Sequence, residues 1–182
     1  MEVPWSWVVL RSAGVVAMAL LTLSVAAGLV GPRLGPSWRL GTITVHRGSA
    51  VAGSALVAGH VVLGVLDGWI DLDWVAAVVP GTSGWQRWGM ALGTLGVDLL
   101  VALLVTTAVR LRHPSAWRRV HWVAYPVWAL AVGHALLVGT DAQLVRRMAA
   151  ACAGVVLAAL AVRLLGSSRT ARAQVLPGTG AP

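Results

Sequence analysis

Five apolar stretches limit what this chain of 182 residues can fold into. Each is long enough to cross a lipid bilayer, because a spanning α-helix needs about 20 mostly apolar residues. The stretches are residues 7–30, 44–66, 88–109, 119–138 and 148–165. We therefore predict an all-α integral membrane protein, a bundle of five transmembrane helices within residues 1–165. A disordered tail is predicted for residues 166–182.

The composition supports this prediction. Hydrophobic residues make up 58% of the chain and charged residues 11%, whereas soluble domains average about 25% charged residues. The first stretch contains Arg11 and follows Glu2, which favours a retained anchor over a signal peptide. Abundant Ala, Gly, Val and Arg are typical of a GC-rich bacterial genome.

The 14 basic residues are all arginine, and they lie at the ends of the apolar stretches. This placement indicates membrane topology, and we expect no nucleic-acid partner. The segments after the first, third and fifth stretches hold ten arginines and no acidic residue: Arg33, Arg39, Arg47, Arg110, Arg112, Arg118, Arg119, Arg163, Arg169 and Arg172. Because loops rich in arginine stay in the cytoplasm, we predict an external N-terminus and a cytoplasmic C-terminus in a bacterial plasma membrane.

Four of the five histidines fall into two pairs on two of the stretches. His46 and His60 lie on the second stretch, and His121 and His134 lie on the fourth. These two helices are expected to run in the same direction, since one crossing separates them. His46 and His121 should therefore share one depth near the cytoplasmic surface, with His60 and His134 about 20 Å further out.

Two facing imidazoles at each depth point to haem. An imidazole in hydrocarbon is costly unless it is paired or liganded, and two imidazoles can fill both axial positions of a haem iron. The single cysteine, Cys152, excludes a CxxCH attachment site, so the haem would be of the non-covalent b type. Zinc fits less well, because it prefers three or four close ligands and each depth offers only two histidines. The alternative is four histidines that are satisfied separately at helix contacts.

Helical geometry supports the second stretch better than the fourth. Fourteen residues at about 100° each return to within about 40° of the starting face, so His46 and His60 share a side. Gly53 lies midway between them, where it leaves room for a flat macrocycle or serves ordinary small-residue packing. On the fourth stretch, 13 residues leave His134 about 140° from His121. Pro126 lies between these two histidines and can kink or re-phase the helix.

Several charged residues are further candidates. Haem propionates need cationic partners near the interface. Arg11 is the candidate for the outer haem, and Arg47 and Arg119 are candidates for the inner one; the alternative is that these arginines only orient the bundle. Asp98 lies within the third stretch. It is a candidate proton relay or a carboxylate that orients a ligand histidine; the alternative is a neutral acid bonded to the backbone or to Thr94.

The stretches "HRGSAVAGSALVAGH" and "RLRHPSAWRRVHWVAYPVWALAVGHALLVGTD" resemble the ferric reductase-like transmembrane domain. That superfamily includes the membrane parts of NADPH oxidases, ferric reductases and the haem subunit of the bacterial periplasmic methionine-sulfoxide reductase system. Its hallmark is two histidines on one helix and two on a later parallel helix, at spacings like those found here. The resemblance covers residues 5–165. It implies two stacked bis-histidine haems, one held by His46 and His121 and the other by His60 and His134.

The chain departs from many members of that superfamily in its C-terminal part. Those members have a sixth span and a cytoplasmic FAD/NADPH domain. Residues 166–182 contain no GxGxxG or other nucleotide-binding signature. We therefore expect that a separate flavin reductase or a membrane quinol would supply the electrons.

The expected function is that of a di-haem b-type membrane cytochrome, the electron-transfer subunit of an oxidoreductase. It would transfer electrons across the plasma membrane to an external acceptor that the sequence does not identify. The alternative is a haem-free membrane scaffold or transporter subunit, in which the histidines serve packing or proton transfer. A third interpretation, in which the outer haem is an oxidase or reductase active site, needs an open iron position, and two histidines per iron oppose it.

Overall fold

The computed structural model describes residues 5–67 and 72–175, and it describes side chains up to residue 165. Every regular element of these residues is helical, as the predicted fold class requires. The elements are α1 (Trp5–Val30), η1 (Gly31–Arg33), α2 (Pro36–Leu66), α3 (Trp74–Val78), α4 (Arg87–Ala108), α5 (Pro114–Val120), η2 (His121–Val123), α6 (Ala124–Val138) and α7 (Ala142–Val175).

Five helical segments of the described residues are long and apolar enough to cross a membrane, so the chain is a multi-pass membrane protein. They are Trp5–Arg33, Pro36–Leu66, Arg87–Ala108, Pro114–Val138 and Ala142–Leu165. Many large apolar side chains on them face outward; Trp38 is 70% exposed and Leu160 is 38% exposed. A surface of this kind suits contact with lipid.

Proline and aspartate mark where several helices begin. Pro36 and Pro114 occupy the first turn of α2 and α5, where a missing N–H costs nothing and the fixed φ is already helical. The carboxylate of Asp73 accepts a hydrogen bond from the N–H of Ala76 at 2.7 Å and caps α3. Asp141 caps α7 in the same way, through the N–H of Leu144 at 3.3 Å.

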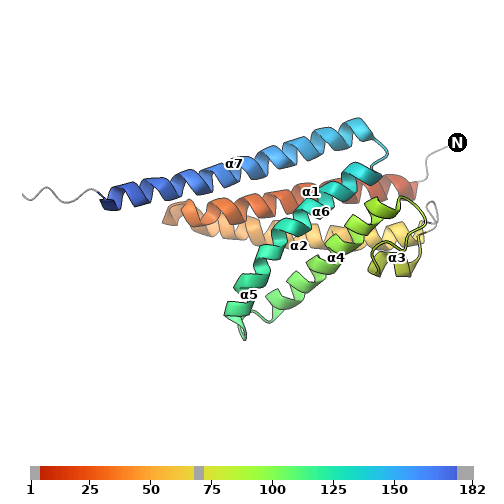
Figure 1. Cartoon of the computed structure of the whole chain (residues 1–182), viewed down its shortest axis with the longest axis horizontal. Helices are drawn as coiled ribbons and strands as arrows, with labels where there is room; N and C mark the ends of the chain where they lie inside the picture. Colours follow the sequence, from red (N-terminus) through yellow and green to blue (C-terminus); the bar gives the residue numbers. More distant parts are fainter. Residues whose placement is uncertain (1–4, 68–71, 176–182) are drawn as a thin grey trace, which may run out of the picture.

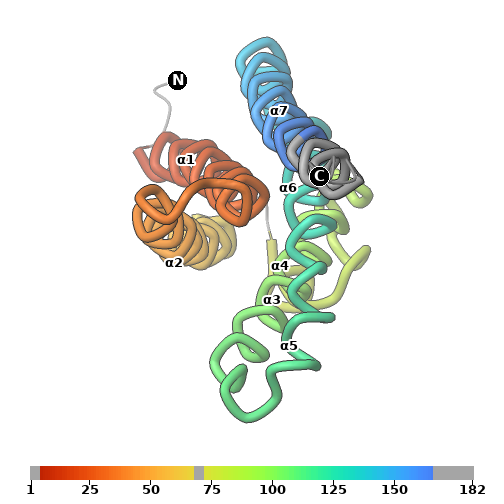
Figure 2. The backbone as a smooth tube through the Cα atoms, turned by 90° about the vertical axis from the view of Figure 1, so that its left-hand side faces the viewer, coloured from red at the N-terminus to blue at the C-terminus, as the bar shows by residue number. Residues whose placement is uncertain are grey.

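The long helices form two antiparallel hairpins. The first hairpin consists of α1 packed on α2, and the second of α4 packed on α6. The two hairpins stand apart in the end-on view (Figure 2), and they are joined mainly through α1, which also contacts α6 and α7. Along the long axis, α2 and α6 run in the same direction (Figure 1), as predicted. The two spans that hold the paired histidines are therefore parallel and belong to different hairpins, although His121 itself lies on η2, just before α6.

Close packing within each hairpin depends on glycine. A Cβ atom at Gly89 of α4 would lie 2.5 Å from a methyl group of Val138 on α6. A Cβ atom at Gly53 of α2 would lie 3.1 Å from a methyl group of Leu21 on α1. Small residues let transmembrane helices approach closely, and these glycines serve that purpose.

The fourth span is not one regular helix. The 3₁₀ turn η2 (His121–Val123) separates α5 from α6. Pro126 explains its place, because proline cannot bond the carbonyl four residues earlier and its ring clashes with it. That carbonyl belongs to Trp122, in the middle of η2. The backbone tightens there, and His121 is the first residue of this turn.

Candidate functional site: two facing histidine pairs

The structure brings the four membrane histidines together as two pairs, one from each hairpin. The ring centroids of His46 and His121 are 6.0 Å apart, and the planes of the two rings are inclined at 77°. The ring centroids of His60 and His134 are 6.3 Å apart, with an interplanar angle of 86°. Each pair thus has nearly the same separation and the same perpendicular arrangement.

His60 is oriented by α1. Its Nδ1–H donates a hydrogen bond to the carbonyl of Leu10 at 2.9 Å. A Cβ atom at Gly14 would lie 3.0 Å from Cε1 of the His60 ring, so the glycine makes room for the imidazole one helical turn beyond the carbonyl. Because a carbonyl can only accept, this bond places the proton on Nδ1 and leaves Nε2 with a free lone pair.

His46 is held in the same way, 14 residues away on both helices. Its Nδ1–H donates to the carbonyl of Ser24 at 2.8 Å, and the hydroxyl of Ser24 donates to the carbonyl of His46 at 3.1 Å. A Cβ atom at Gly28 would lie 3.3 Å from the His46 ring. The carbonyl-and-glycine pattern of α1 therefore repeats with the same step as the histidines of α2.

His134 uses α4 for the same purpose. Its Nδ1–H donates to the carbonyl of Gly89 at 2.8 Å. A Cβ atom at Gly93 would lie 2.5 Å from Nδ1 of His134, so only glycine leaves space for the ring. Three of the four histidines thus share one arrangement, a carbonyl for Nδ1 and a glycine four residues later.

His121 lacks this arrangement. Its Nδ1 atom is buried without a hydrogen-bond partner among the described residues. The ring packs on the indole of Trp117, with ring centroids 5.0 Å apart and an interplanar angle of 36°.

A cavity of about 220 Å³ lies at the His60–His134 pair. Its wall includes residues of α1, α2, α3, α4, α6 and α7, and most of the lining atoms are apolar. His60, His134 and Arg11 are among its few polar residues. A concave, mostly apolar space with a few convergent polar groups is the usual form of a cofactor or ligand site.

The residues fit a metal held between two imidazoles. Metal–nitrogen bonds of about 2 Å on both sides of one ion would separate the ring centroids by about 6 Å, close to the 6.0 and 6.3 Å observed. Ligand histidines usually donate their other ring N–H to a carbonyl or carboxylate, as three of these do. The described residues contain no cluster of three or more His, Cys, Asp or Glu side chains, so a metal here would need its remaining ligands from a cofactor such as porphyrin.

Separately satisfied histidines explain less of this geometry. Helix contacts do satisfy Nδ1 of three rings. They do not explain why a ring from each hairpin meets its counterpart at both depths, nor why Nδ1 of His121 is buried unpaired.

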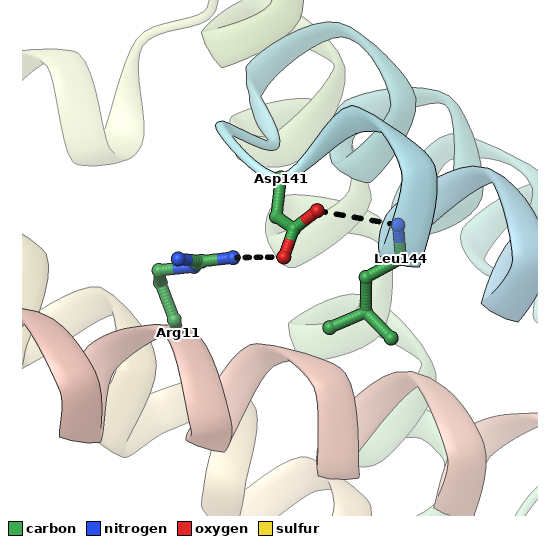
Figure 3. A network of polar contacts seen from close by, with 3 residues as sticks. All are labelled: Arg11, Asp141 and Leu144. Carbon is green, nitrogen blue, oxygen red and sulfur yellow. Dashed lines mark hydrogen bonds and ion pairs between the residues drawn. The ribbon is translucent and has the colours of Figure 1, made fainter.

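The three candidate arginines lie in different surroundings. Arg11 lines the cavity, and its guanidinium is 3.7 Å from the carboxylate of Asp141, across the gap between α1 and the start of α7 (Figure 3). Both side chains are partly exposed, at 38% and 50%. Arg47 and Arg119 are exposed near the His46–His121 pair. Gly53 packs on α1 and is not among the residues that line the cavity.

Asp98 does not pair with Thr94. The hydroxyl of Thr94 donates instead to the carbonyl of Ala76, on α3, at 2.8 Å. The fifth histidine, His113, precedes the first turn of α5 and is exposed.

One residue that sequence reasoning missed lies between the two pairs. Trp128 is on α6 between His121 and His134, and its indole N–H donates to the hydroxyl of Thr22 on α1 at 2.9 Å. That hydroxyl in turn donates to the carbonyl of Met18 at 2.8 Å. A tryptophan roughly midway between two histidines was the available signal.

We compared the chain with models of known protein families, with curated proteins and with solved structures, and none of them matches it.

Proposed function

We propose that this protein is a di-haem b-type cytochrome that transfers electrons across a bacterial plasma membrane. His46 and His121 would ligate one haem, and His60 and His134 the other. The observation that supports this most strongly is the repeated geometry of the two pairs. At both depths the ring centroids are 6.0 and 6.3 Å apart, which is about the separation expected when two imidazoles bind one metal ion.

The haem supplies reversible one-electron chemistry when it is bound. The protein's own residues fix where that chemistry takes place. The carbonyls of Leu10, Ser24 and Gly89 hold three imidazoles in the Nδ1–H tautomer, which raises the basicity of the ligating Nε2. Apolar side chains make up most of the cavity wall around the His60–His134 pair.

Arginines near both pairs would bind the anionic propionates. Arg11 is suited to the His60–His134 haem, because it already lines that cavity. Arg47 and Arg119 are suited to the other haem, since both are exposed near the His46–His121 pair. A guanidinium binds a carboxylate through two parallel hydrogen bonds.

The arginine distribution orients the proposed electron path in the membrane. If the arginine-rich segments are cytoplasmic, the His46–His121 pair lies near the cytoplasm. Electrons would enter there from a flavin reductase or from quinol, and leave through the His60–His134 pair to an external acceptor. The resemblance to ferric reductase-like transmembrane domains supports the same assignment.

A reduced-minus-oxidised spectrum and a pyridine-haemochrome count on the purified protein test the proposal. We expect a Soret band, a dithionite-induced α band and both haems in each chain. His60→Ala should remove the haem of its own pair and leave the other largely intact. His113→Ala is the matched control, because His113 lies outside both pairs, and it should retain both haems.

A colourless protein that folds normally after each His→Ala substitution would contradict the proposal. That result would favour the haem-free scaffold or transporter subunit, with histidines that only stabilise helix contacts.

A further inference from the structure

His121 differs from the other three histidines in how its ring is held. The Nδ1 atoms of His46, His60 and His134 donate to backbone carbonyls at 2.8, 2.9 and 2.8 Å. The Nδ1 atom of His121 is buried and has no such partner within the part of the chain that the structure describes. Its ring packs instead on Trp117. Three rings are therefore fixed in tautomer and orientation, and the fourth is positioned by ring packing.

On α4, the carbonyl at the position equivalent to those that hold the other histidines already accepts a side-chain hydrogen bond. The pattern on α1 repeats after 14 residues, and the same step from Gly89 and Gly93 of α4 leads to Leu103 and Thr107. The hydroxyl of Thr106 donates a hydrogen bond that is shared between the carbonyls of Ala102, at 2.9 Å, and Leu103, at 3.0 Å. Thr107 has a side chain where the pattern requires glycine. These two positions offer the fourth histidine neither a free carbonyl nor room beside one.

Thr107 instead helps to place the ring on which His121 packs. Its hydroxyl accepts a hydrogen bond from the indole N–H of Trp117 at 3.2 Å. The contact between Trp117 and His121 involves ring faces and no directed hydrogen bond. Ring packing of this kind fixes the rotation of an imidazole less firmly than a hydrogen bond to Nδ1 does.

The backbone under His121 is also different. His121 is the first residue of η2, the 3₁₀ turn between α5 and α6. His46, His60 and His134 all lie within regular α-helix. A short 3₁₀ segment within a longer helical stretch often marks a hinge. The side chain with the fewest constraints is thus attached to the least regular backbone.

We infer that His121 is the exchangeable ligand of the four, so that the His46–His121 site can bind a small neutral ligand in its place. This inference rests on the proposed haem ligation. The ligand class is a neutral donor such as carbon monoxide or free imidazole. In the exchange, the metal–nitrogen bond to His121 breaks and one bond to the incoming ligand forms. No electron is gained or lost, and the imidazole remains neutral.

Carbon monoxide added to the dithionite-reduced protein provides the test. We expect it to bind one of the two haems of the wild-type chain and not the other. His121→Ala should retain that haem on His46, and its carbon monoxide spectrum should superimpose on that of the wild type. His134→Ala should either lose the other haem or show carbon monoxide binding at both.

Three results would overturn the inference while leaving the proposed function in place. In the first, neither haem of the wild-type protein binds carbon monoxide. In the second, both haems of the wild-type protein bind it equally. In the third, the carbon monoxide spectrum of the wild type differs from that of His121→Ala and matches that of His134→Ala. A protein without any Soret band would overturn the proposed function itself.

A second pair of variants tests the blocked carbonyl. The double variant Thr106→Val, Thr107→Gly removes the hydroxyl bonded to the carbonyl of Leu103 and the side chain beside that carbonyl, and should lower the affinity for carbon monoxide several-fold. Thr107→Gly alone is the matched control, because it loses the same bond to Trp117 and keeps the Thr106 hydroxyl. Equal affinity in the two variants would overturn the role assigned to Leu103.

Nitrogen-15 spectra of histidine side chains give a readout that does not depend on ligand binding. In the reduced protein we expect fixed Nδ1–H signals for His46, His60 and His134, and an exchange-averaged signal for His121. A fixed Nδ1–H signal for His121 as well would overturn the inference, whether or not the protein contains haem.

Discussion

A Cβ atom at Gly93 would lie 2.5 Å from Nδ1 and 2.8 Å from Cε1 of His134, closer than real side chains approach. The same histidine donates to the carbonyl of Gly89, one turn earlier on α4. Any side chain at position 93 must therefore push the ring away from its acceptor. Glycine at this position, like Gly14 and Gly28 on α1, allows a histidine of one helix to reach the backbone of the next.

Gly93→Ala should accordingly remove the haem of the His60–His134 pair and leave that of the other pair. The displaced ring loses its hydrogen bond to Gly89, and ligand histidines without such a partner typically bind metal 10- to 100-fold more weakly. The pyridine-haemochrome count measures the loss. Gly59→Ala is the control, because a Cβ atom there would meet nothing within 4 Å. Equal haem contents in the two variants would contradict the role of Gly93.

The angles between the paired rings lead to a second prediction for single residues. The planes are inclined at 77° and 86°. Perpendicular axial imidazoles give ferric low-spin haem a strongly anisotropic electron paramagnetic resonance spectrum, whereas parallel planes give a rhombic one. We expect strongly anisotropic signals from both haems of the oxidised protein. A purely rhombic spectrum would show that the rings turn when haem binds.

At the scale of the elements, hydropathy located the five spans but not their ends. The structure begins α2 at Pro36, whereas the sequence placed the span at residue 44, because helix initiation depends on proline and capping as well as on apolar length. The last helix continues to Val175, beyond the span end predicted at residue 165; residues 176–182 of the predicted tail lie outside the described residues. The sequence pointed to Pro126 as the place where the fourth span departs from a regular helix, but it did not predict the 3₁₀ turn that precedes this proline.

The partners of the histidines were harder to predict than the histidines themselves. Leu10, Ser24 and Gly89 contribute backbone carbonyls, and every residue has one, so side-chain identity gives no signal. The glycines did give one, since Gly14 and Gly28 repeat the 14-residue spacing of His46 and His60. The role of such a repeat becomes clear only once α1 is known to pack on α2.

Trp128 allows a prediction about how the two hairpins are joined. Its hydrogen bond to Thr22 links α6 to α1, and interhelical hydrogen bonds in membranes contribute about 0.6 kcal/mol on average and up to about 2 kcal/mol. Trp128→Phe should lower the free energy of unfolding by about 1 kcal/mol, measured by denaturation in mixed detergent micelles. Trp38→Phe, at a side chain that is 70% exposed, should change it little. An equal loss of unfolding free energy in both variants would contradict a stabilising role for the hydrogen bond between Trp128 and Thr22.

At the scale of the whole molecule, the two hairpins share fewer contacts than each has within itself. The helices α2 and α6 both belong to the site, but each packs mainly on its own hairpin partner. A ligand bound by one histidine from each hairpin would therefore connect the two halves of the bundle. Whatever binds the folded protein and not the unfolded chain stabilises it, by about 2.7 kcal/mol at 100 times the dissociation constant.

Haem loading should therefore raise the temperature at which the bundle unfolds. The intrinsic fluorescence of the ten tryptophans can report this temperature for haem-loaded and haem-depleted protein. The double variant His46→Ala, His60→Ala has no ligand on α2, and its unfolding temperature should not change with haem supply. An identical temperature for loaded and depleted wild-type protein would mean that the cofactor does not connect the hairpins.

The contact between α7 and α1 has a consequence for how the chain is made. Ribosomes deliver α1 and α2 to the membrane before α7, yet α7 packs on α1, and Leu144 and Val145 at the start of α7 line the cavity. During synthesis there is thus an interval in which both hairpins are inserted while this wall of the cavity is still missing. A large planar cofactor could enter sideways during that interval, and the arrival of α7 would then add this wall.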